Sequence, residues 1–337
     1  MQTSHTRVDE QAPSNRTPSL SAPFLELLRC PACGGRLNPA PEGLECTERS
    51  CQRHYPVVDG VPVLIDDESS VFSIADVVRG RNSTGWTEQS KLKRLVRPLV
   101  PTISKNVRAE RYYARFAQEL LAQIRHPRVL VVGSGVAREG MAVLESNPTI
   151  EILDTDVVFS PLARVVCDGH RLPFADGSFD GVVMQAVLEH VIDPWRCVAE
   201  AHRVLKPRGL VYGETPFMQQ VHGREFDFTR FSHLGHRRLF RQFDEIESGA
   251  SCGPGMALAW AWEYFLMSFS STPLTRRVAQ LMARVTAFPF KYFDHVLVDR
   301  PAALDAASGV CFIGRRSDSV LDDRKLIQGY RGGMRRV

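Results

Sequence analysis

The sequence lacks the long apolar segments that would insert a chain into a membrane. None of its apolar runs reaches about 18 residues, the length at which a transmembrane helix is expected. Residues 1–22 are polar, include Pro13 and Pro18, and contain no apolar core, so no secretion signal is expected and this segment is predicted to be disordered. These absences predict a cytoplasmic protein.

A strong excess of one charge sign is also absent. The formal net charge of the 337 residues is +4, with 44% hydrophobic and 24% charged residues, which is ordinary for a globular protein. Such a chain has room for one large domain and a small one. The mild basicity does not favour nucleic acid as a partner, because a solvated basic surface explains it more simply.

Four cysteines stand close together in the sequence between residues 30 and 51. With no secretion signal, a metal site explains such a cluster better than disulfides do. Two cysteine hairpins place four thiolates at the corners of a tetrahedron, the coordination that zinc prefers. We therefore expect a structural Zn²⁺ in a zinc-ribbon domain over residues 24–66, with the ligands Cys30, Cys33, Cys46 and Cys51.

Strand and helix patterns alternate from residue 106 onward, which predicts an α/β fold. We expect a Rossmann-like, mostly parallel seven-stranded sheet with helices on both faces and a helical insertion before the last strand. Residues 157–163, between the second and third strands, are fewer than the dozen or so that a parallel crossover needs. A turn around Ser160 and Pro161 must replace the usual helix there, or the third strand is vestigial. The strands are expected at 129–133, 150–156, 164–167, 179–185, 210–214, 245–249 and 309–314.

Several segments of this region resemble one family of enzymes. They are the turn Gly133-Ser-Gly135, the acid Asp156 after the second strand, Asp168 before Gly169-His170-Arg-Leu-Pro-Phe174, and Leu205-Lys-Pro-Arg-Gly209. In this order they are similar to the S-adenosylmethionine core of class I methyltransferases, most of all the methyltransferase type 11 family, over roughly residues 105–248.

The resemblance implies S-adenosylmethionine as cofactor, bound beyond the carboxyl ends of the strands. Glycines at the first turn let the backbone approach the ligand closely. Asp156 is expected to accept the ribose hydroxyls, in preference to Asp154, which lies deeper in the strand. Asp168 suits the adenine amino group. The expected cofactor-binding residues are Gly133, Ser134, Gly135, Asp156, Asp168, Gly169, His170 and Gln185.

The alternative for the sheet is a nicotinamide-binding domain. Its fingerprint needs a third glycine three residues after the second, where this chain has Arg138. Two departures from the methyltransferase pattern are also visible. Val131 stands where an acid usually precedes the first glycine, and Arg208 replaces a glycine. Losing the acid weakens or rearranges the contact to the methionine amino group.

The N-terminal unit carries a second resemblance. Residues 24–65 share a Cys-Pro-x-Cys-x-Gly start and a Tyr-Pro-x-x-Asp-Gly-x-Pro end with small zinc-ribbon proteins that activate tRNA and protein methyltransferases. The second cysteine pair is Cys-x4-Cys here, whereas the family has Cys-x2-Cys. Cys46 is therefore the less certain ligand, and His54 is a substitute for it.

Histidines near the ligand edge are candidate catalytic bases. Transfer of a methyl group to a hydroxyl needs a group that removes the proton, and histidine suits neutral pH. The candidates are His190, His222 and His233, the last two in a segment that follows the fifth strand and is expected to form the acceptor side. The Asn/Asp-Pro-Pro-aromatic motif of amino-methylating enzymes is absent after the fourth strand. We therefore expect a small-molecule or saccharide-like acceptor methylated on oxygen.

Two other functions stay open. The ribbon and the mild basicity suggest a methyltransferase for tRNA or a translation factor, and a non-catalytic scaffold of the same fold is the other alternative. The apolar run at 256–293 predicts helices that cover the sheet, a homodimer contact, or peripheral membrane contact. The expected parts are 1–22 disordered, 24–66 zinc ribbon, 67–105 linker, 106–316 methyltransferase domain with its insertion at 253–300, and 317–337 flexible tail.

Overall fold

The computed structural model describes residues 17–80, 101–135 and 138–334. Residues 1–16 of the predicted disordered segment and residues 81–100 of the predicted linker lie outside these ranges. The N-terminal unit comprises α1 (Ala22–Leu25), β1 (Leu37–Ala40), β2 (Gly43–Cys46), β3 (His54–Val58) and β4 (Val61–Leu64), followed by α2 (Ile74–Val78).

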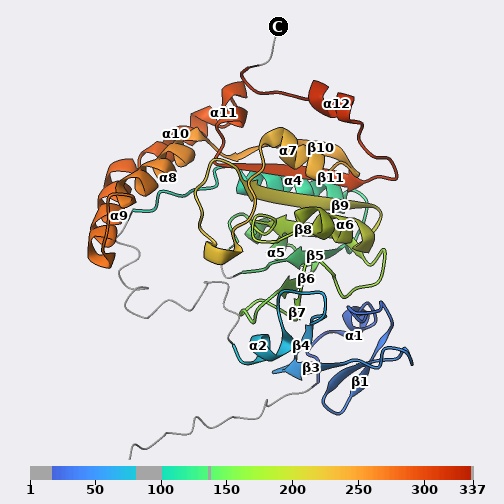
Figure 1. The fold of residues 1–337 in the computed structure, drawn as a ribbon. Coiled ribbons are helices and arrows are strands. Elements are labelled where there is room, and N and C mark those ends of the chain that lie inside the picture. The colour runs from blue at the N-terminus through green and yellow to red at the C-terminus, as the bar shows by residue number, and fades with distance from the viewer. Residues whose placement is uncertain (1–16, 81–100, 136–137, 335–337) are drawn as a thin grey trace, which may run out of the picture.

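The central sheet confirms the predicted α/β class. Seven of its strands stand in the order β7-β6-β5-β8-β9-β11-β10 (Figure 1). They are parallel except β11, which runs antiparallel to β9 and β10. The strands are β5 (Arg128–Val132), β6 (Glu151–Asp156), β7 (Val165–Cys167), β8 (Phe179–Gln185), β9 (Leu205–Pro216), β10 (Phe243–Cys252) and β11 (Gly309–Arg316).

Helices cover both faces of the sheet, because alternate strand residues are apolar on each side. Val129 and Val131 of β5 pack in one buried cluster with α4 (Ala109–Leu121) and α5 (Ala142–Glu145). Leu130 and Val132 belong to the other cluster, with α6 (Pro194–Val204) and α7 (His233–Leu239). Both helix layers therefore rest on the same short strand, which fixes the turn that follows it.

The crossover from β6 to β7 contains no helix, as its length predicts. The Ser160 hydroxyl accepts a hydrogen bond from the Ala163 amide at 3.1 Å, so a turn leads directly into a third strand of three residues. The segment between β5 and β6 also holds little helix, since only α5 (Ala142–Glu145) forms among its described residues.

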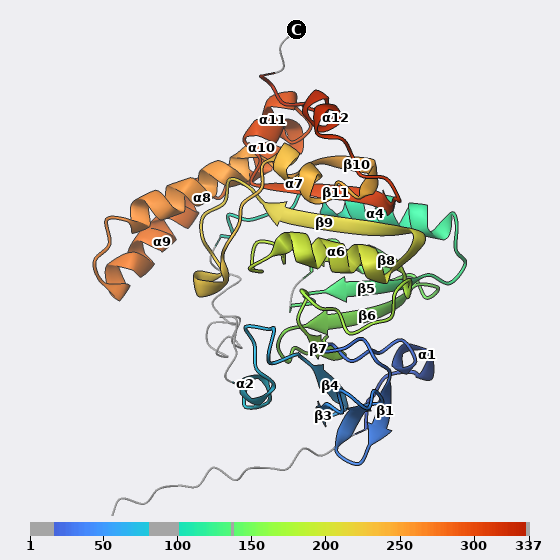
Figure 2. The same ribbon diagram turned by 45° about the vertical axis from the view of Figure 1, so that its right-hand side comes forward.

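The zinc-ribbon unit extends the central sheet. Its strands β1 to β4 pair antiparallel in sequence order, and β4 then pairs parallel with β7, so the sheet has 11 strands. Figure 2 shows β4 beside β7, and the register matches Val63 with Val166 and Leu64 with Cys167. Asp66, just after β4, accepts a hydrogen bond from Arg171 at 2.8 Å. The ribbon and the larger domain thus share one sheet, an arrangement that the sequence does not predict.

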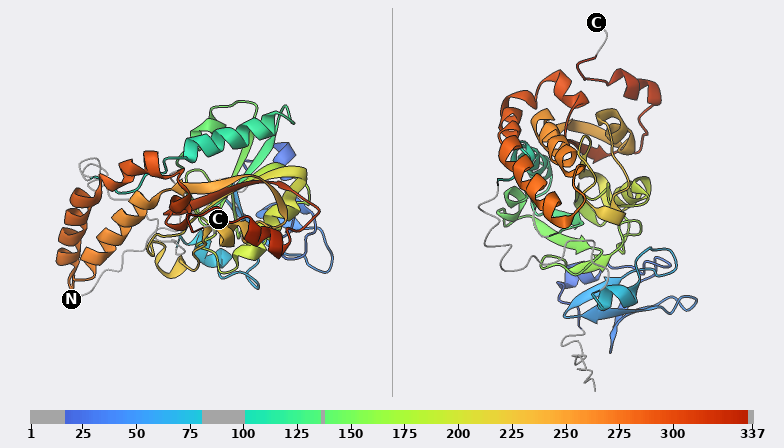
Figure 3. Two further views of the ribbon diagram at one scale, coloured as in Figure 1. Left: turned by 90° about the horizontal axis from the view of Figure 1, so that it is seen from above. Right: turned by 60° about the vertical axis from the view of Figure 1, so that its left-hand side comes forward.

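The insertion before β11 forms helices that project from the body (Figure 3). They are α8 (Pro254–Met267), α9 (Pro273–Ala287) and α10 (Phe290–Leu297), followed by α11 (Pro301–Asp305). The described part of the tail holds α12 (Asp323–Gln328), and Tyr330 donates hydrogen bonds of 2.8 Å to Asp305. This part of the tail therefore has defined contacts where the sequence predicts a flexible segment.

Candidate functional site

A cavity of about 750 Å³ opens at the carboxyl ends of the parallel strands. It lies where the strand order reverses, between β5 and β8, which is the usual ligand position in an open α/β sheet. Its volume is within the range of small-molecule sites. Every expected cofactor-binding residue lines it, namely Gly133, Ser134, Gly135, Asp156, Asp168, Gly169, His170 and Gln185.

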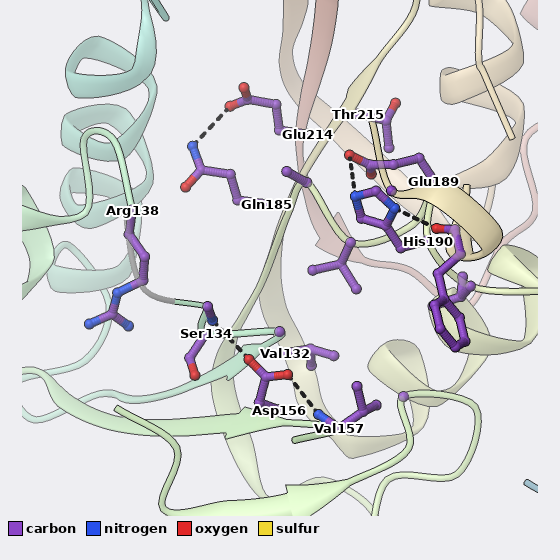
Figure 4. A pocket seen from close by; sticks show the side chains of 18 of the residues that line it. Val132, Ser134, Arg138, Asp156, Val157, Gln185, Glu189, His190, Glu214 and Thr215 are labelled. Carbon is purple, nitrogen blue, oxygen red and sulfur yellow. Dashed lines mark hydrogen bonds and ion pairs between the residues drawn. The ribbon is translucent and has the colours of Figure 1, made fainter. Parts of the chain in front are cut away.

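The turn after β5 requires its glycines. Gly133 has φ of +72°, and a Cβ placed on it would lie 2.4 Å from Cγ2 of Val187. Gly135 has φ of +54°, a region that other residues rarely adopt. Its amide points across to β6 and donates to Asp156 Oδ2 at 2.9 Å (Figure 4). The turn therefore presents bare backbone to the cavity.

Asp156 is fixed at the end of β6 by backbone amides. Its second oxygen, Oδ1, accepts from the Val157 amide at 2.8 Å. Burial raises the pKa of this carboxyl, and the amides partly offset that rise. Asp154 does not line the cavity and pairs with Arg138 instead. This arrangement agrees with the preference for Asp156.

Asp168 is held from two directions. Its Oδ1 accepts from the amide and Nδ1 of His170 at 2.9 and 2.6 Å, and its Oδ2 accepts from Ser70 at 2.5 Å. Burial alone would raise the pKa of Asp168, but the hydrogen bonds from His170 and Ser70 outweigh it and lower the pKa. One lone pair on Oδ2 stays free for a ligand donor.

A buried carboxyl that the sequence reasoning missed lies at the end of β9. Glu214 lines the cavity. Its carboxylate accepts hydrogen bonds from the Tyr212 hydroxyl at 2.5 Å and from the side-chain Nδ2 of Asn106 at 2.6 Å. Burial raises its pKa to about 7. Gln185 lies beside it, with Nε2 3.4 Å from Glu214 Oε2. Glu214 directly precedes the segment that was expected at the ligand edge, and this position was the sequence signal that could have identified it.

Two of the three candidate histidines meet on the other side of the cavity, beside Glu189. His190 Nε2 lies 3.7 Å from Glu189 Oε1 (Figure 4). His222 Nε2 lies 3.8 Å from the same oxygen. Burial lowers the pKa of His222, but the neighbouring Glu189 outweighs this effect and raises it. Asp227 fixes the His222 loop, because it accepts the His222 and Gly223 amides at 2.7 and 3.0 Å.

His233 is not part of this site, which corrects the prediction. It lies at the start of α7, where Ser232 caps the helix by accepting from the Gly235 amide. Its Nε2 lies 3.0 Å from both Ser248 Oγ and Arg331 Nη2, and it does not line the cavity. Burial lowers its pKa to about 4. The cap turns the chain away from the cavity after residue 231, so His233 packs against β10.

The four cysteines of the ribbon come together as predicted. Their Sγ atoms all lie within 4.8 Å of one another, with Cys33 and Cys46 3.4 Å apart and Cys30 and Cys51 3.7 Å apart. Sulfurs around a tetrahedral zinc lie about 3.8 Å apart, given Zn–S bonds of about 2.3 Å. The cluster therefore fits structural zinc. His54 is not part of the group, so Cys46 fits the fourth ligand position.

Comparison with other proteins agrees with both parts of this geometry. Residues 132–213 match the family described as methyltransferase domain, and residues 22–60 match the family described as Trm112p-like protein. Residues 132–213 are thus similar to a methyltransferase domain. An uncharacterized methyltransferase of Mycobacterium sp. (strain JLS) is 36% identical over 112 residues, which cover 31% of this chain and 44% of that protein. The chain thus spans less than half the length of that relative.

Further likenesses concern the ribbon and the fold. A UPF0434 protein of Yersinia enterocolitica is 42% identical over 51 residues, or 15% of this chain and 85% of that protein. A complex of the Haloferax volcanii Trm112 methyltransferase activator with a methyltransferase is 19% identical, covers 62% of this chain and 92% of that one, and has a TM-score of 0.35. Haemonchus contortus phosphoethanolamine N-methyltransferase 2 is 16% identical, with 60% of this chain and 53% of that chain covered and a TM-score of 0.37.

The segment that follows the ribbon also contributes to the cavity. Val71 and Phe72 line it, and the Phe72 ring stacks on Phe226 with centroids 5.6 Å apart. Phe226 belongs to the loop that carries His222. The sequence predicts a linker over residues 67–105 and does not predict this contact, because no local pattern distinguishes a residue that lines the cavity from one in a linker.

Proposed function

We propose that this chain transfers a methyl group from S-adenosylmethionine to a hydroxyl oxygen of a small-molecule or saccharide-like acceptor. One observation carries the proposal. The carboxylates of Asp156 and Asp168 follow neighbouring parallel strands and face the same cavity as the bare backbone of Gly133. That arrangement provides acceptors for a ribose and for an adenine amino group beside room for a close backbone approach.

The residues divide the cavity into a cofactor side and an acceptor side. Asp156 would accept the ribose hydroxyls and Asp168 Oδ2 the adenine amino group, whereas Glu214 and Gln185 would receive the methionine amino group. This last role compensates for Val131, which replaces the usual acid. When bound, the cofactor supplies an already activated methyl group, so the protein mainly has to align the acceptor with it.

The acceptor side would bind and deprotonate a hydroxyl. His190 and His222 hold ring nitrogens next to Glu189, so a proton leaving the acceptor has basic groups within reach. The cavity wall around them includes exposed apolar side chains, Ile192 and Phe228 among them. An acceptor with both a hydroxyl and an apolar portion fits this lining.

We further propose that the helices α8 to α10 contact an anionic membrane surface. Two acids of these helices, Glu263 and Asp294, are buried, whereas Arg276 and Arg277 are exposed. An apolar surface with exposed positive charge suits anionic lipid. No described helix is long and apolar enough to cross a membrane. The apolar side chains that are at least half exposed include Leu258, Phe265, Phe269, Leu274, Met282 and Val285.

This surface adjoins the acceptor side of the cavity. The Tyr264 hydroxyl of α8 donates to the Val221 carbonyl, and the Trp260 ring lies 6.0 Å from the His222 ring. A membrane-bound acceptor would therefore meet the cavity from α8. Co-sedimentation of the full chain with phosphatidylserine vesicles tests the idea, with phosphatidylcholine vesicles as control. A wholly soluble pool at low salt contradicts it, and a dimer that hides these side chains would show a doubled mass by sedimentation equilibrium.

Calorimetry with S-adenosylhomocysteine tests the main proposal. We expect micromolar binding. Asp156→Ala should weaken it at least about tenfold, because a hydrogen bond to a charged group contributes about 1.5 kcal/mol or more and about 1.4 kcal/mol is a factor of ten in Kd. Absence of binding at millimolar ligand would leave the non-catalytic scaffold as the better reading. Radiolabelled methyl transfer across hydroxylated metabolite classes then identifies the acceptor.

One observation favours a second candidate function. Residues 22–60 match the Trm112p-like family, and a solved relative of that name is described as a methyltransferase activator in complex with a methyltransferase. In this chain the ribbon and the methyltransferase domain are one polypeptide. A substrate such as tRNA or a translation factor would follow from that likeness, and total tRNA should be included in the methyl-transfer screen.

A further inference from the structure

The acceptor side of the cavity contains a buried carboxylate that has no hydrogen-bond partner in the described part of the chain. Glu189 has an exposed fraction of 0%, and neither of its oxygens has a hydrogen-bond partner among the described residues. Leaving such a group without a partner is costly, so buried carboxylates are usually paired or bind a metal. The two side chains nearest to it are those of His190 and His222, and each offers a ring nitrogen.

Both rings are oriented with Nε2 toward Glu189. His190 Nδ1 donates to the Phe226 carbonyl at 2.6 Å, and its buried Nε2 has no hydrogen-bond partner among the described residues. His222 Nδ1 lies 3.2 Å from the Gln220 carbonyl and 3.6 Å from Asp227 Oδ2. Metal-binding histidines characteristically donate their other ring nitrogen to a carbonyl or carboxylate in this way.

The distances fit a shared cation better than a direct hydrogen bond. The two Nε2 atoms lie 3.7 and 3.8 Å from Glu189 Oε1, which is too long for a hydrogen bond. All three ligand atoms lie within 4.8 Å of one another. Ligands around a tetrahedral zinc with bonds of about 2.1 Å stand roughly 3.4 Å apart, so a small inward movement completes the set.

We propose that Glu189, His190 and His222 bind a divalent transition metal ion, separate from the zinc of the four cysteines. Two imidazoles and one carboxylate suit Zn²⁺, Co²⁺, Mn²⁺ or Fe²⁺, whereas Ca²⁺ and Mg²⁺ prefer oxygen ligands. Three protein ligands leave coordination positions open toward the cavity, which these residues line. If the proposed methyl transfer is correct, the two histidines would then act as ligands instead of proton acceptors. An acceptor hydroxyl bound to the cation would release its proton to water more easily, because the cation would stabilise the oxyanion.

Cobalt binding to the full-length chain tests the proposal without any need for activity. Cobalt bound by thiolates shows an intense charge-transfer band, whereas cobalt bound by nitrogen and oxygen shows only weak visible bands. We expect two equivalents per chain, one of each kind. Glu189→Gln and His222→Gln should each lose only the equivalent without the charge-transfer band. His126→Ala, which removes an exposed histidine before β5, should keep both.

A wild-type chain that binds one equivalent, all of it with the charge-transfer band, would overturn the proposal. So would two equivalents retained in both Glu189→Gln and His222→Gln. Circular dichroism separates loss of metal from loss of fold, and the wild-type stoichiometry decides the question even if a variant does not fold. Calorimetry with S-adenosylhomocysteine is independent of this result, so failure of the metal site and failure of the proposed methyl transfer are distinguishable.

Discussion

Ser70 and Asp168 come from distant parts of the chain, and the Ser70 hydroxyl donates a hydrogen bond of 2.5 Å to Asp168 Oδ2. Ser70 follows the zinc ribbon, whereas Asp168 follows the strand with which the ribbon pairs. The ribbon therefore does more than lengthen the sheet. The segment after it holds the carboxylate that we assign to the adenine amino group, so ribbon docking and cofactor recognition are coupled in this chain.

Replacing Asp168 should remove the preference for adenine. S-inosylhomocysteine carries an oxygen where S-adenosylhomocysteine has the amino group. A hydrogen bond to a charged group contributes about 1.5 to 3 kcal/mol, so the wild type should prefer S-adenosylhomocysteine at least about tenfold. Asp168→Ala should bring the ratio of the two Kd values, measured by calorimetry, close to one. Ser70→Ala keeps the carboxylate and should keep most of the preference; an unchanged ratio in Asp168→Ala would refute the assignment.

The two glycines after β5 should respond differently to alanine. A Cβ on Gly133 would lie 2.4 Å from Val187 Cγ2, whereas a Cβ on Gly135 meets nothing within 4 Å. Gly133→Ala should weaken S-adenosylhomocysteine binding much more than Gly135→Ala, which carries only the strain of positive φ. Adding Val187→Ala to Gly133→Ala removes the close contact and should recover part of the affinity. Equal losses at the two glycines would contradict this reading of the turn.

The fold was largely predictable, because its signals are local. The buried run before Gly133 and the acid at Asp156 mark two neighbouring strand ends by themselves, and parallel strands bring their ends to one edge. The pairing of β4 with β7 was not predictable from such signals. It joins two short strands far apart in the sequence, through two residue pairs such as Val63 with Val166, and no nearby residue marks either strand as the partner of the other.

The site was only partly predictable for a related reason. Residue type drew attention to His190, His222 and His233 alike, but contacts across the fold decide between them. The Ser232 cap directs His233 away from the cavity. Glu189 lies with the other two histidines, and it directly precedes His190 in the sequence, but its residue type alone did not mark it as part of the site. The periodicity of apolar residues indicates which face of a helix or strand is buried, but it does not indicate which residues a loop contacts.

A matched pair of variants distinguishes Cys46 from His54 as the fourth zinc ligand. Cys46 Sγ lies 3.4 Å from Cys33 Sγ, whereas His54 is outside the cluster. Cys46→Ser should lower the zinc content of the thiolate site and the midpoint of thermal unfolding, because metal binding supplies much of the folding free energy of so small a unit. His54→Ala should leave both unchanged. Zinc retained at full stoichiometry by Cys46→Ser would mean that another group completes the tetrahedron.

Arg208 occupies a backbone conformation that suits glycine. Its φ is +64°, and its side chain is exposed near the start of β9. Arg208→Gly should raise the free energy of unfolding by about 1 kcal/mol, because glycine adopts positive φ without the Cβ clash. Arg208→Ala removes the same side chain but keeps the Cβ, so it should show no such gain. Urea unfolding of the three proteins gives the comparison, and a gain shared by both variants would point to charge instead of backbone strain.

The buried Glu214 should leave a signature in the pH dependence of stability. Burial raises its pKa from 4.5 to about 7 in the folded chain. Between these values the native state retains a proton that the unfolded chain releases, so the free energy of unfolding falls as pH rises through this interval. At about 1.4 kcal/mol per pH unit, the loss attributable to Glu214 is about 3 kcal/mol and is complete above pH 7.

Glu214→Gln should remove that loss, because the amide keeps the shape of the side chain but does not titrate. Urea unfolding of the wild type and the variant at pH 5, 6, 7 and 8 measures it. From pH 5 to pH 8, the free energy of unfolding of the wild type should fall by about 2.5 kcal/mol relative to that of the variant. Glu225→Gln, at an exposed position, should run parallel to the wild type. Parallel curves for Glu214→Gln as well would mean that this carboxyl is ionised in the folded chain throughout, and its contact with the cofactor amino group would then be a preformed charge pair.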